Sequence, residues 1–194
     1  MSSTATDARS LMTIDEFMAW DGGGHAGKLE LIDGVVRAMA PASATHSIIQ
    51  GNLVAAIHSH LRARGSRCRV APEAPIQPAI RKQGNVRAPD VAVTCSPPSA
   101  SKLFEDPVLI IEVLSPSNVD DTWESIRALA PLLTLTEIVV VASEKIEVEI
   151  FRKGEGGGWN PAPDGFQSGM IRLASIDLEL PISDVYRGTY LAEI

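Results

Sequence analysis

RAPDVAVTC at residues 87–95 and DPVLIIEVLSPSN at residues 106–118 decide the fold of this chain. Each stretch contains an apolar run with the length and composition of a buried β-strand. Each run also carries one carboxylate, Asp90 in the first and Glu112 in the second. An ionised carboxylate removed from water must be paired, protonated or bound to a metal, because its desolvation is costly. Two carboxylates on neighbouring strands would suit a divalent cation.

The composition predicts one soluble domain. The chain has 194 residues, of which 45% are hydrophobic and 21% charged, which is enough for a full hydrophobic core. We expect residues 1–10 to be disordered and residues 11–194 to form the single domain. The sequence contains no apolar run of the roughly 20 residues that cross a bilayer and no secretory signal at its start. We therefore expect a cytoplasmic protein without membrane contact.

Charge and cysteine content restrict the function further. The net charge of −7 argues against binding nucleic acid through overall electrostatics, although it leaves room for local basic groups. Cys68 and Cys95 form no CxxC pair, and a structural disulfide would be unusual in the cytosol. We interpret both cysteines as free, buried, small apolar residues.

The remaining segments predict helices and strands around the two central runs. Asp33 and Gly34 fit the turn of a β-hairpin, and Thr45 fits the N-cap of the longest helix. The order of elements predicts a mixed α/β domain with helices packed against a central sheet. The expected elements are helices over 11–20, 45–64 and 121–133, a hairpin over 28–40, an edge strand or an irregular strand broken by prolines over 68–80, strands over 137–142 and 146–152, and a peripheral tail over 159–194.

Several short motifs occur in one order along the chain. An acidic strand residue follows Asp90 after 22 positions (112 − 90), as in nucleases of the PD-(D/E)XK superfamily. With the other motifs, the chain closely resembles the Uma-two family, a bacterial domain of unknown function described as restriction-endonuclease-like. The resemblance covers about residues 11–190 and implies a restriction-endonuclease-like fold. The motifs are ELIDG at 30–34, His46 in the long helix, PDVAV at 89–93, EVLSPSN at 112–118 and EIVVV at 137–141.

The resemblance implies a metal-dependent DNA endonuclease in which Glu30, Asp90 and Glu112 are catalytic. Asp90 and Glu112 would hold Mg²⁺ or Mn²⁺ through oxygen ligands, and the metal would activate a water for attack on a phosphodiester. Glu30 would orient a second metal or a water, and His46 would be an accessory contact to the phosphate or the metal. DNA is the implied partner, and a homodimer is implied by analogy with nucleases that cut two strands with two subunits.

The chain departs from the superfamily at one position. The superfamily has a lysine two residues after the second acid, where this chain has Leu114. In many relatives the lysine lies instead on the next helix, where this chain has Ser125 or, with a shift of one residue, Ile126. Arg127 is the nearest cation and an accessory candidate, although two residues along a helix rotate a side chain by about 200°. The alternative sources of a cation are Arg87, Arg37 and Lys28.

Three functions remain open from the sequence. The first is a metal-dependent DNA endonuclease or nickase. The second is a catalytically weakened or inactive nuclease-fold protein that acts as a DNA-binding or protein-interaction module, which the missing lysine and the net charge favour. The third is an enzyme of another class that uses the same acidic pocket, and a serine hydrolase is disfavoured because no GxSxG motif is present.

Overall fold

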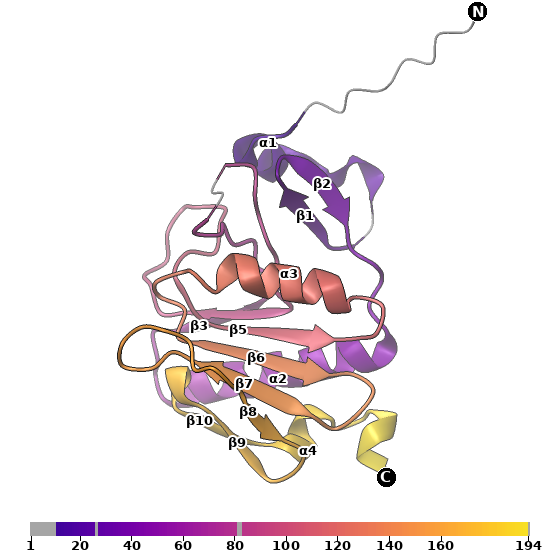
Figure 1. Cartoon of the computed structure of the whole chain (residues 1–194), viewed down its shortest axis with the longest axis vertical. Helices are drawn as coiled ribbons and strands as arrows, with labels where there is room; N and C mark the ends of the chain where they lie inside the picture. The colour runs from indigo at the N-terminus through magenta and orange to yellow at the C-terminus, as the bar shows by residue number, and fades with distance from the viewer. Residues whose placement is uncertain (1–10, 26, 81–82, 194) are drawn as a thin grey trace, which may run out of the picture.

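A six-stranded mixed sheet forms the centre of the computed structural model, which describes residues 11–25, 27–80 and 83–193 (Figure 1). The strand order is β3-β4-β5-β6-β7-β8, with β5 and β6 parallel and the other neighbouring pairs antiparallel. The strands are β3 (Arg69–Pro72), β4 (Val91–Thr94), β5 (Pro107–Leu114), β6 (Glu137–Ala142), β7 (Val148–Arg152) and β8 (Asp164–Phe166). The predicted mixed α/β fold is confirmed.

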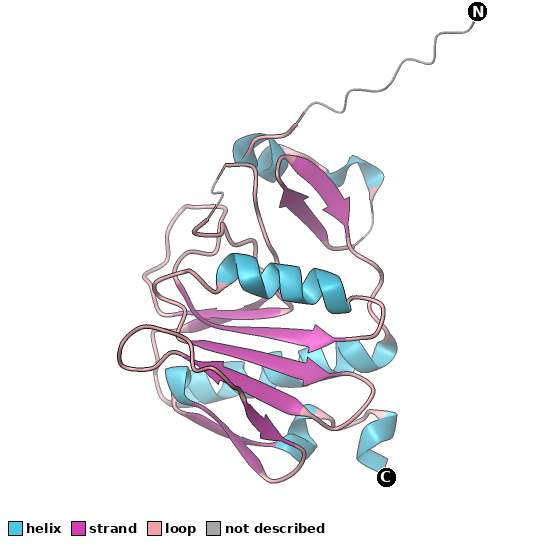
Figure 2. Cartoon of the chain, in the orientation of Figure 1, coloured by secondary structure: helices cyan, strands magenta, loops and turns pink. Residues whose placement is uncertain are grey.

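Helix α2 (Ala44–Ala63) covers one face of the sheet (Figure 2). Its N-cap is Ser43 rather than the expected Thr45, because the Ser43 hydroxyl accepts the backbone N–H of His46 at 3.2 Å. This places His46 in the first turn of the helix, at the end of the sheet where β4 begins. The buried residues follow the predicted spacing of four and are Ile49, Leu53, Ile57 and Leu61.

Helix α3 (Val119–Leu129) covers the opposite face and connects the parallel strands β5 and β6 (Figure 1). It ends before Pro131, whose ring is incompatible with a continuing helix. Ile126 and Leu129 pack on the strand residues Ala92 and Ile110. The two central strands are therefore covered on both sides, as their continuous apolar runs predict.

The N-terminal part of the chain forms a separate small layer beside α3 (Figure 1). A capping box at Thr13 and Glu16 starts α1 (Ile14–Ala19), and a short 3₁₀ helix, η1 (Gly22–Gly24), follows. The predicted hairpin is β1 (Leu29–Ile32) and β2 (Val35–Ala38), with its turn at Asp33 and Gly34 in the positive-φ region. The hairpin joins the rest of the molecule through backbone hydrogen bonds between Leu31 and Val86.

The C-terminal part is more deeply integrated than the peripheral tail we expected. Ile171, Leu173, Ile182 and Tyr186 are buried in the same core as α2 and the central strands. These residues fill the α2 face of the sheet, where one helix alone is too narrow to cover six strands. The elements are β9 (Met170–Leu173), η2 (Ala174–Ile176), β10 (Leu178–Pro181), α4 (Ile182–Val185) and η3 (Tyr190–Glu193).

Two buried polar groups fix this C-terminal layer to the sheet. The Glu137 carboxylate accepts hydrogen bonds from Arg152, from the backbone N–H of Ala174 and from the backbone and hydroxyl of Ser175. The Tyr186 hydroxyl donates to backbone carbonyls of the β6–β7 turn, and burial raises the pKa of Tyr186 to about 12. None of the helices in the described part of the chain is long and apolar enough to cross a membrane.

The interpretation of the cysteines as free thiols was wrong. Cys68 and Cys95 form a disulfide, and both side chains are half-buried rather than fully buried. The antiparallel pairing of Arg69 with Thr94 places the two cysteines directly opposite each other, one position beyond the ladder. The sequence alone does not contain this strand register, so the pairing was not predictable from the spacing of the cysteines.

We expect the disulfide to stabilise the domain by closing a loop of 27 residues. Loop closure of this length corresponds to about 2–4 kcal/mol of unfolding free energy. Urea unfolding with and without a phosphine reductant measures the effect, and the Cys68→Ser/Cys95→Ser variant should match the reduced wild type. An unchanged midpoint on reduction would contradict this expectation.

Candidate active site

Asp90 and Glu112 converge at the end of the central sheet. Asp90 immediately precedes β4, and continuation of the Val91–Ile111 pairing places it opposite Glu112 on β5. The Asp90 backbone N–H lies 3.4 Å from Glu112 Oε2, and the two residues are 4% and 3% exposed. Both carboxylates therefore lie on the α3 face of the sheet, as two-residue alternation in the strands predicts.

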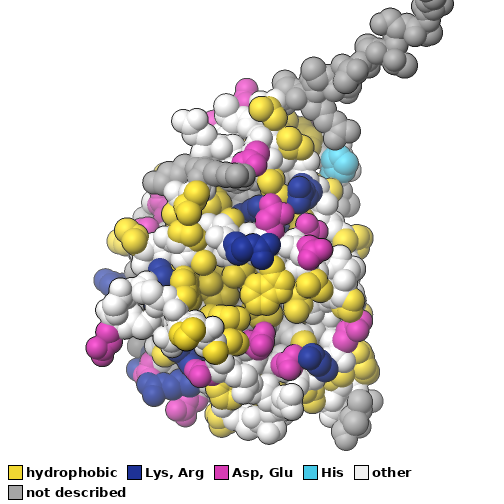
Figure 3. All heavy atoms as spheres, viewed as in Figure 1, with side chains coloured by type: hydrophobic (Ala, Val, Ile, Leu, Met, Phe, Trp, Pro, Cys, Tyr) yellow, Lys and Arg dark blue, Asp and Glu magenta, His cyan; other side chains and the backbone are white. Residues whose placement is uncertain are grey.

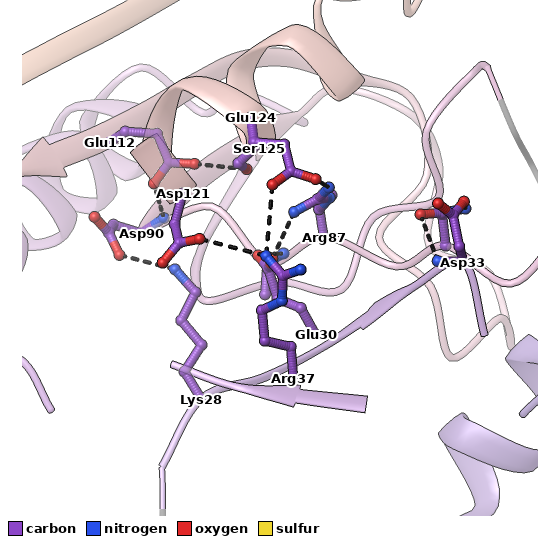
Figure 4. A network of polar contacts seen from close by, with 12 residues as sticks. Lys28, Glu30, Asp33, Arg37, Arg87, Asp90, Glu112, Asp121, Glu124 and Ser125 are labelled. Carbon is purple, nitrogen blue, oxygen red and sulfur yellow. Dashed lines mark hydrogen bonds and ion pairs between the residues drawn. The ribbon is translucent and has the colours of Figure 1, made fainter. Parts of the chain in front are cut away.

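The Asp90 carboxylate is held by several partners. Oδ1 lies 3.1 Å from Lys28 Nζ (Figure 4), and Oδ2 accepts the backbone N–H of Val113 at 2.7 Å and lies 3.4 Å from His46 Nε2. Gln50 donates to the Asp90 backbone carbonyl at 2.8 Å. Burial would raise the pKa of Asp90, but the His46 hydrogen bond and the Lys28 charge outweigh it and hold the pKa below its usual value. Asp90 is therefore ionised at neutral pH.

Glu112 has the opposite protonation behaviour. Its Oε1 accepts the Ser125 hydroxyl of α3 at 2.9 Å. Burial raises the pKa of Glu112 to about 8, with the Asp90 charge adding to the rise and the Lys28 charge opposing it. The metal-free pair consequently carries one proton and one negative charge near neutral pH, which is the usual outcome when two carboxylates share a buried site.

Lys28 is the cation of this site. Its ammonium lies among the acidic groups, one residue before β1. Burial would lower the pKa of Lys28, but the charges of Glu112 and Asp90 outweigh it and hold the pKa above its usual value. The sequence named Lys28 as one of three alternative cations. Alternation puts Lys28 on the same side of the hairpin as Glu30, but it puts Arg37, the cross-strand partner of Glu30, there as well, so only the tertiary structure selects Lys28.

Glu30 lies beside this pair but has different partners. Oε2 accepts from Arg87 Nη1 at 3.1 Å, and Oε1 accepts the backbone N–H of Ala88 at 2.9 Å. Arg87 also donates through Nη2 to Glu124 on α3 at 2.9 Å (Figure 4). Both oxygens of Glu30 are thus engaged in holding the segment that leads into Asp90. Glu30 therefore fixes the position of the backbone that precedes Asp90.

The two accessory candidates differ in position. His46 reaches Asp90 from the first turn of α2 and is buried. Arg127 is exposed on α3 and forms no hydrogen bond or ion pair with the three acids within the described ranges. The structure thus brings His46 to the site and leaves Arg127 outside it.

A pocket of ≈ 420 Å³ opens onto Asp90. Lys28 and His46 contribute to its wall, and the linker between β2 and α2 forms one side. The turn between β5 and α3 forms the other side through Ser115, Ser117 and Asn118. The Lys28–Asp90 pair is thus accessible from this pocket.

The donor set fits a Mg²⁺ or Mn²⁺ ion held by two carboxylates. Asp90 and Glu112 offer hard oxygen ligands from directly opposed strand positions. The described residues contain no group of three or more His, Cys, Asp or Glu arranged to enclose a metal. Mg²⁺ commonly keeps several waters and uses only one or two carboxylates, so a two-carboxylate site matches its chemistry.

Comparisons with known proteins define the fold and the family. The mixed α/β fold is similar to the crystal structure of a putative nuclease belonging to DUF820 from Anabaena variabilis, with a TM-score of 0.67 at 19% identity, covering 90% of this chain and 97% of that one. An uncharacterized protein of Synechocystis sp., slr1290, is 30% identical over 181 residues, which are 91% of this chain and 92% of the relative. Residues 14–183 match Uma2, described as "putative restriction endonuclease", and the chain belongs to this family.

Proposed function

We propose that this chain is a metal-dependent nuclease that hydrolyses phosphodiester bonds in DNA. The observation that carries the proposal is the convergence of two buried carboxylates, Asp90 and Glu112, with one ammonium, Lys28, beside a pocket. The family description supports a nucleic-acid substrate. Asp90 and Glu112 are the proposed metal ligands.

The chain's own residues supply the remaining chemistry. A bound metal would polarise the scissile phosphate and lower the pKa of the attacking water. Lys28 would donate to a phosphate oxygen and stabilise the negative charge that develops there, which is the role left vacant at Leu114 and Ser125. His46 would keep the Asp90 carboxylate oriented, and Ser125 would do the same for Glu112.

The Asp90→Asn substitution should abolish cleavage. It removes one proposed ligand charge while keeping the shape of the side chain. We expect the nicking of plasmid DNA in Mn²⁺ to fall by about 100-fold or more. The matched control is Asp15→Asn on the exposed face of α1, which should leave the rate unchanged. Equal nicking by wild type and Asp90→Asn would show that the site is wrongly assigned.

Removal of the ammonium at residue 28 should slow the chemical step. We expect Lys28→Met to lower kcat by about 100-fold, because a preorganised cation is lost from the transition state. Lys28→Arg should recover part of this loss, and Lys145→Met, a surface change in the β6–β7 turn, should have no effect. A Lys28→Met variant with full kcat and only a raised KM would assign Lys28 to binding alone.

Metal affinity should depend on pH through Glu112. Its pKa of about 8 means that the carboxyl is protonated below that pH, and a metal must displace this proton. Calorimetric titration with Mn²⁺ should therefore give an affinity that falls by up to about tenfold per pH unit as the pH drops below 8. Glu112→Gln should bind more weakly and without this slope. A pH-independent wild-type affinity would contradict the assignment.

One observation favours the non-catalytic alternative. Ser125 stands where the family resemblance implies a lysine, so the proposed catalysis depends on whether Lys28 replaces it. Absence of Mn²⁺ binding at any pH, together with persistent DNA binding, would identify the chain as a binding module with a nuclease fold.

A further inference from the structure

Two arginines converge on one carboxylate next to the acidic pair. Arg87 Nη2 lies 2.9 Å from Glu124 Oε1, and Arg37 Nη1 lies 3.5 Å from Glu124 Oε2 (Figure 4). Arg37 Nη1 is also 3.4 Å from Asp121 Oδ1. The guanidinium groups come from β2 and from the segment before β4, while both carboxylates come from α3. Three parts of the chain therefore meet at this point.

The exposure of these side chains is unequal. The Arg87 side chain is 4% exposed, whereas the side chains of Glu124 and Arg37 are 42% and 46% exposed. Glu124 is thus the solvent-side partner of a buried guanidinium. Arg87 Nε also has no hydrogen-bond partner among the residues that the structure describes. The Arg87 guanidinium therefore has an N–H group, at Nε, that Glu124 does not use.

This arginine pair lies beside the proposed cleavage site. Glu124 precedes Ser125, whose hydroxyl donates to Glu112 at 2.9 Å. Arg87 is three residues before Asp90. The Glu30 carboxylate accepts hydrogen bonds from the Arg87 guanidinium and from the backbone N–H of Ala88, in the segment that leads into Asp90. Asp121 contributes to the wall of the pocket at Asp90. Arg37 contacts Asp121, so the arginine pair lies next to the wall of this pocket.

A nuclease of this charge needs local phosphate sites. The net charge is −7, and on the α3 side Lys and Arg side chains lie among Asp and Glu side chains rather than in a continuous stripe (Figure 3). Long-range attraction therefore contributes little to binding. Guanidinium groups bind carboxylate and phosphate with the same forked geometry, so a carboxylate can occupy a phosphate site.

We propose that Arg37 and Arg87 form a binding site for a backbone phosphate that flanks the cleaved one, and that Glu124 occupies this site in the free protein. The inference rests on the proposed nuclease function. It identifies residues that would hold the DNA strand at the proposed cleavage site. On binding, the phosphate replaces the Glu124 carboxylate, whose side chain is 42% exposed and can turn to solvent, while the buried Arg87 guanidinium keeps an anionic partner. Glu124 then turns outward to solvent.

A purely structural ion pair makes the opposite prediction. If Glu124 only ties the hairpin to α3, its neutralisation would weaken the fold and leave strand binding unchanged or weaker. If Glu124 occupies a phosphate site, its neutralisation frees the arginines, and binding becomes stronger. The sign of the change in affinity separates the two interpretations.

The test is strand binding by Glu124→Gln, measured by fluorescence anisotropy with a fluorescein-labelled oligonucleotide, single-stranded or annealed to its complement. Ca²⁺ replaces Mn²⁺ so that the strand remains intact, which a gel verifies. If Glu124 fills the site about nine-tenths of the time, affinity should rise by about tenfold.

The matched control is Asp120→Asn, which removes the same charge from an exposed position in the first turn of α3. It should change affinity by less than about twofold, since it releases no arginine. Arg37→Gln, an exposed change that should not unfold the protein, should weaken binding and cancel the gain from Glu124→Gln.

Equal gains in Glu124→Gln and Asp120→Asn would overturn the inference, because charge alone would then explain them. A gain that survives Arg37→Gln, or the absence of strand binding by every variant, would overturn it as well. Plasmid nicking by wild type and Asp90→Asn judges the proposed nuclease function separately, so failure of one does not imply failure of the other.

Discussion

The contact between the Lys28 ammonium and the Asp90 carboxylate is the interaction on which this site depends. Two carboxylates forced together by strand pairing cannot both ionise in a buried environment without a compensating cation. The His46 hydrogen bond and the Lys28 charge keep the pKa of Asp90 low, while burial keeps Glu112 protonated near neutral pH. The Lys28 ammonium therefore balances the negative charge that the two carboxylates bring into this buried site.

The small N-terminal layer consequently has a chemical role as well as a structural one. Its hairpin supplies Lys28 and Glu30, which contact the end of the sheet from outside the sheet itself. Glu30 fixes the backbone that leads into Asp90, and Lys28 fixes the carboxylate. The acidic centre is thus assembled between layers, and disruption of the hairpin would disturb the charges at Asp90 before it disturbed the hydrophobic core.

The sequence predicted the central features well, because they follow from local periodicity. The apolar runs around Asp90 and Glu112 predicted buried strands, but only the β4–β5 register put both carboxylates on one face. Long-range pairing was harder to predict. The disulfide depends on the β3–β4 register, the Glu30–Arg87 ion pair on a contact between separate layers, and the choice of Lys28 on tertiary geometry. The C-terminal segment was misjudged because its short strands carry little periodic signal, although its apolar residues fill the core.

The C-terminal layer is synthesised after the acidic residues whose sheet it covers. Residues 28–125 contain the acidic centre and the arginine pair, but the apolar surface beneath the sheet is completed only by Ile171 through Tyr186. A chain emerging from the ribosome would carry the reactive groups before it had the buried surface that holds them in place. Stable assembly of the acidic centre would then await synthesis of the C-terminal layer.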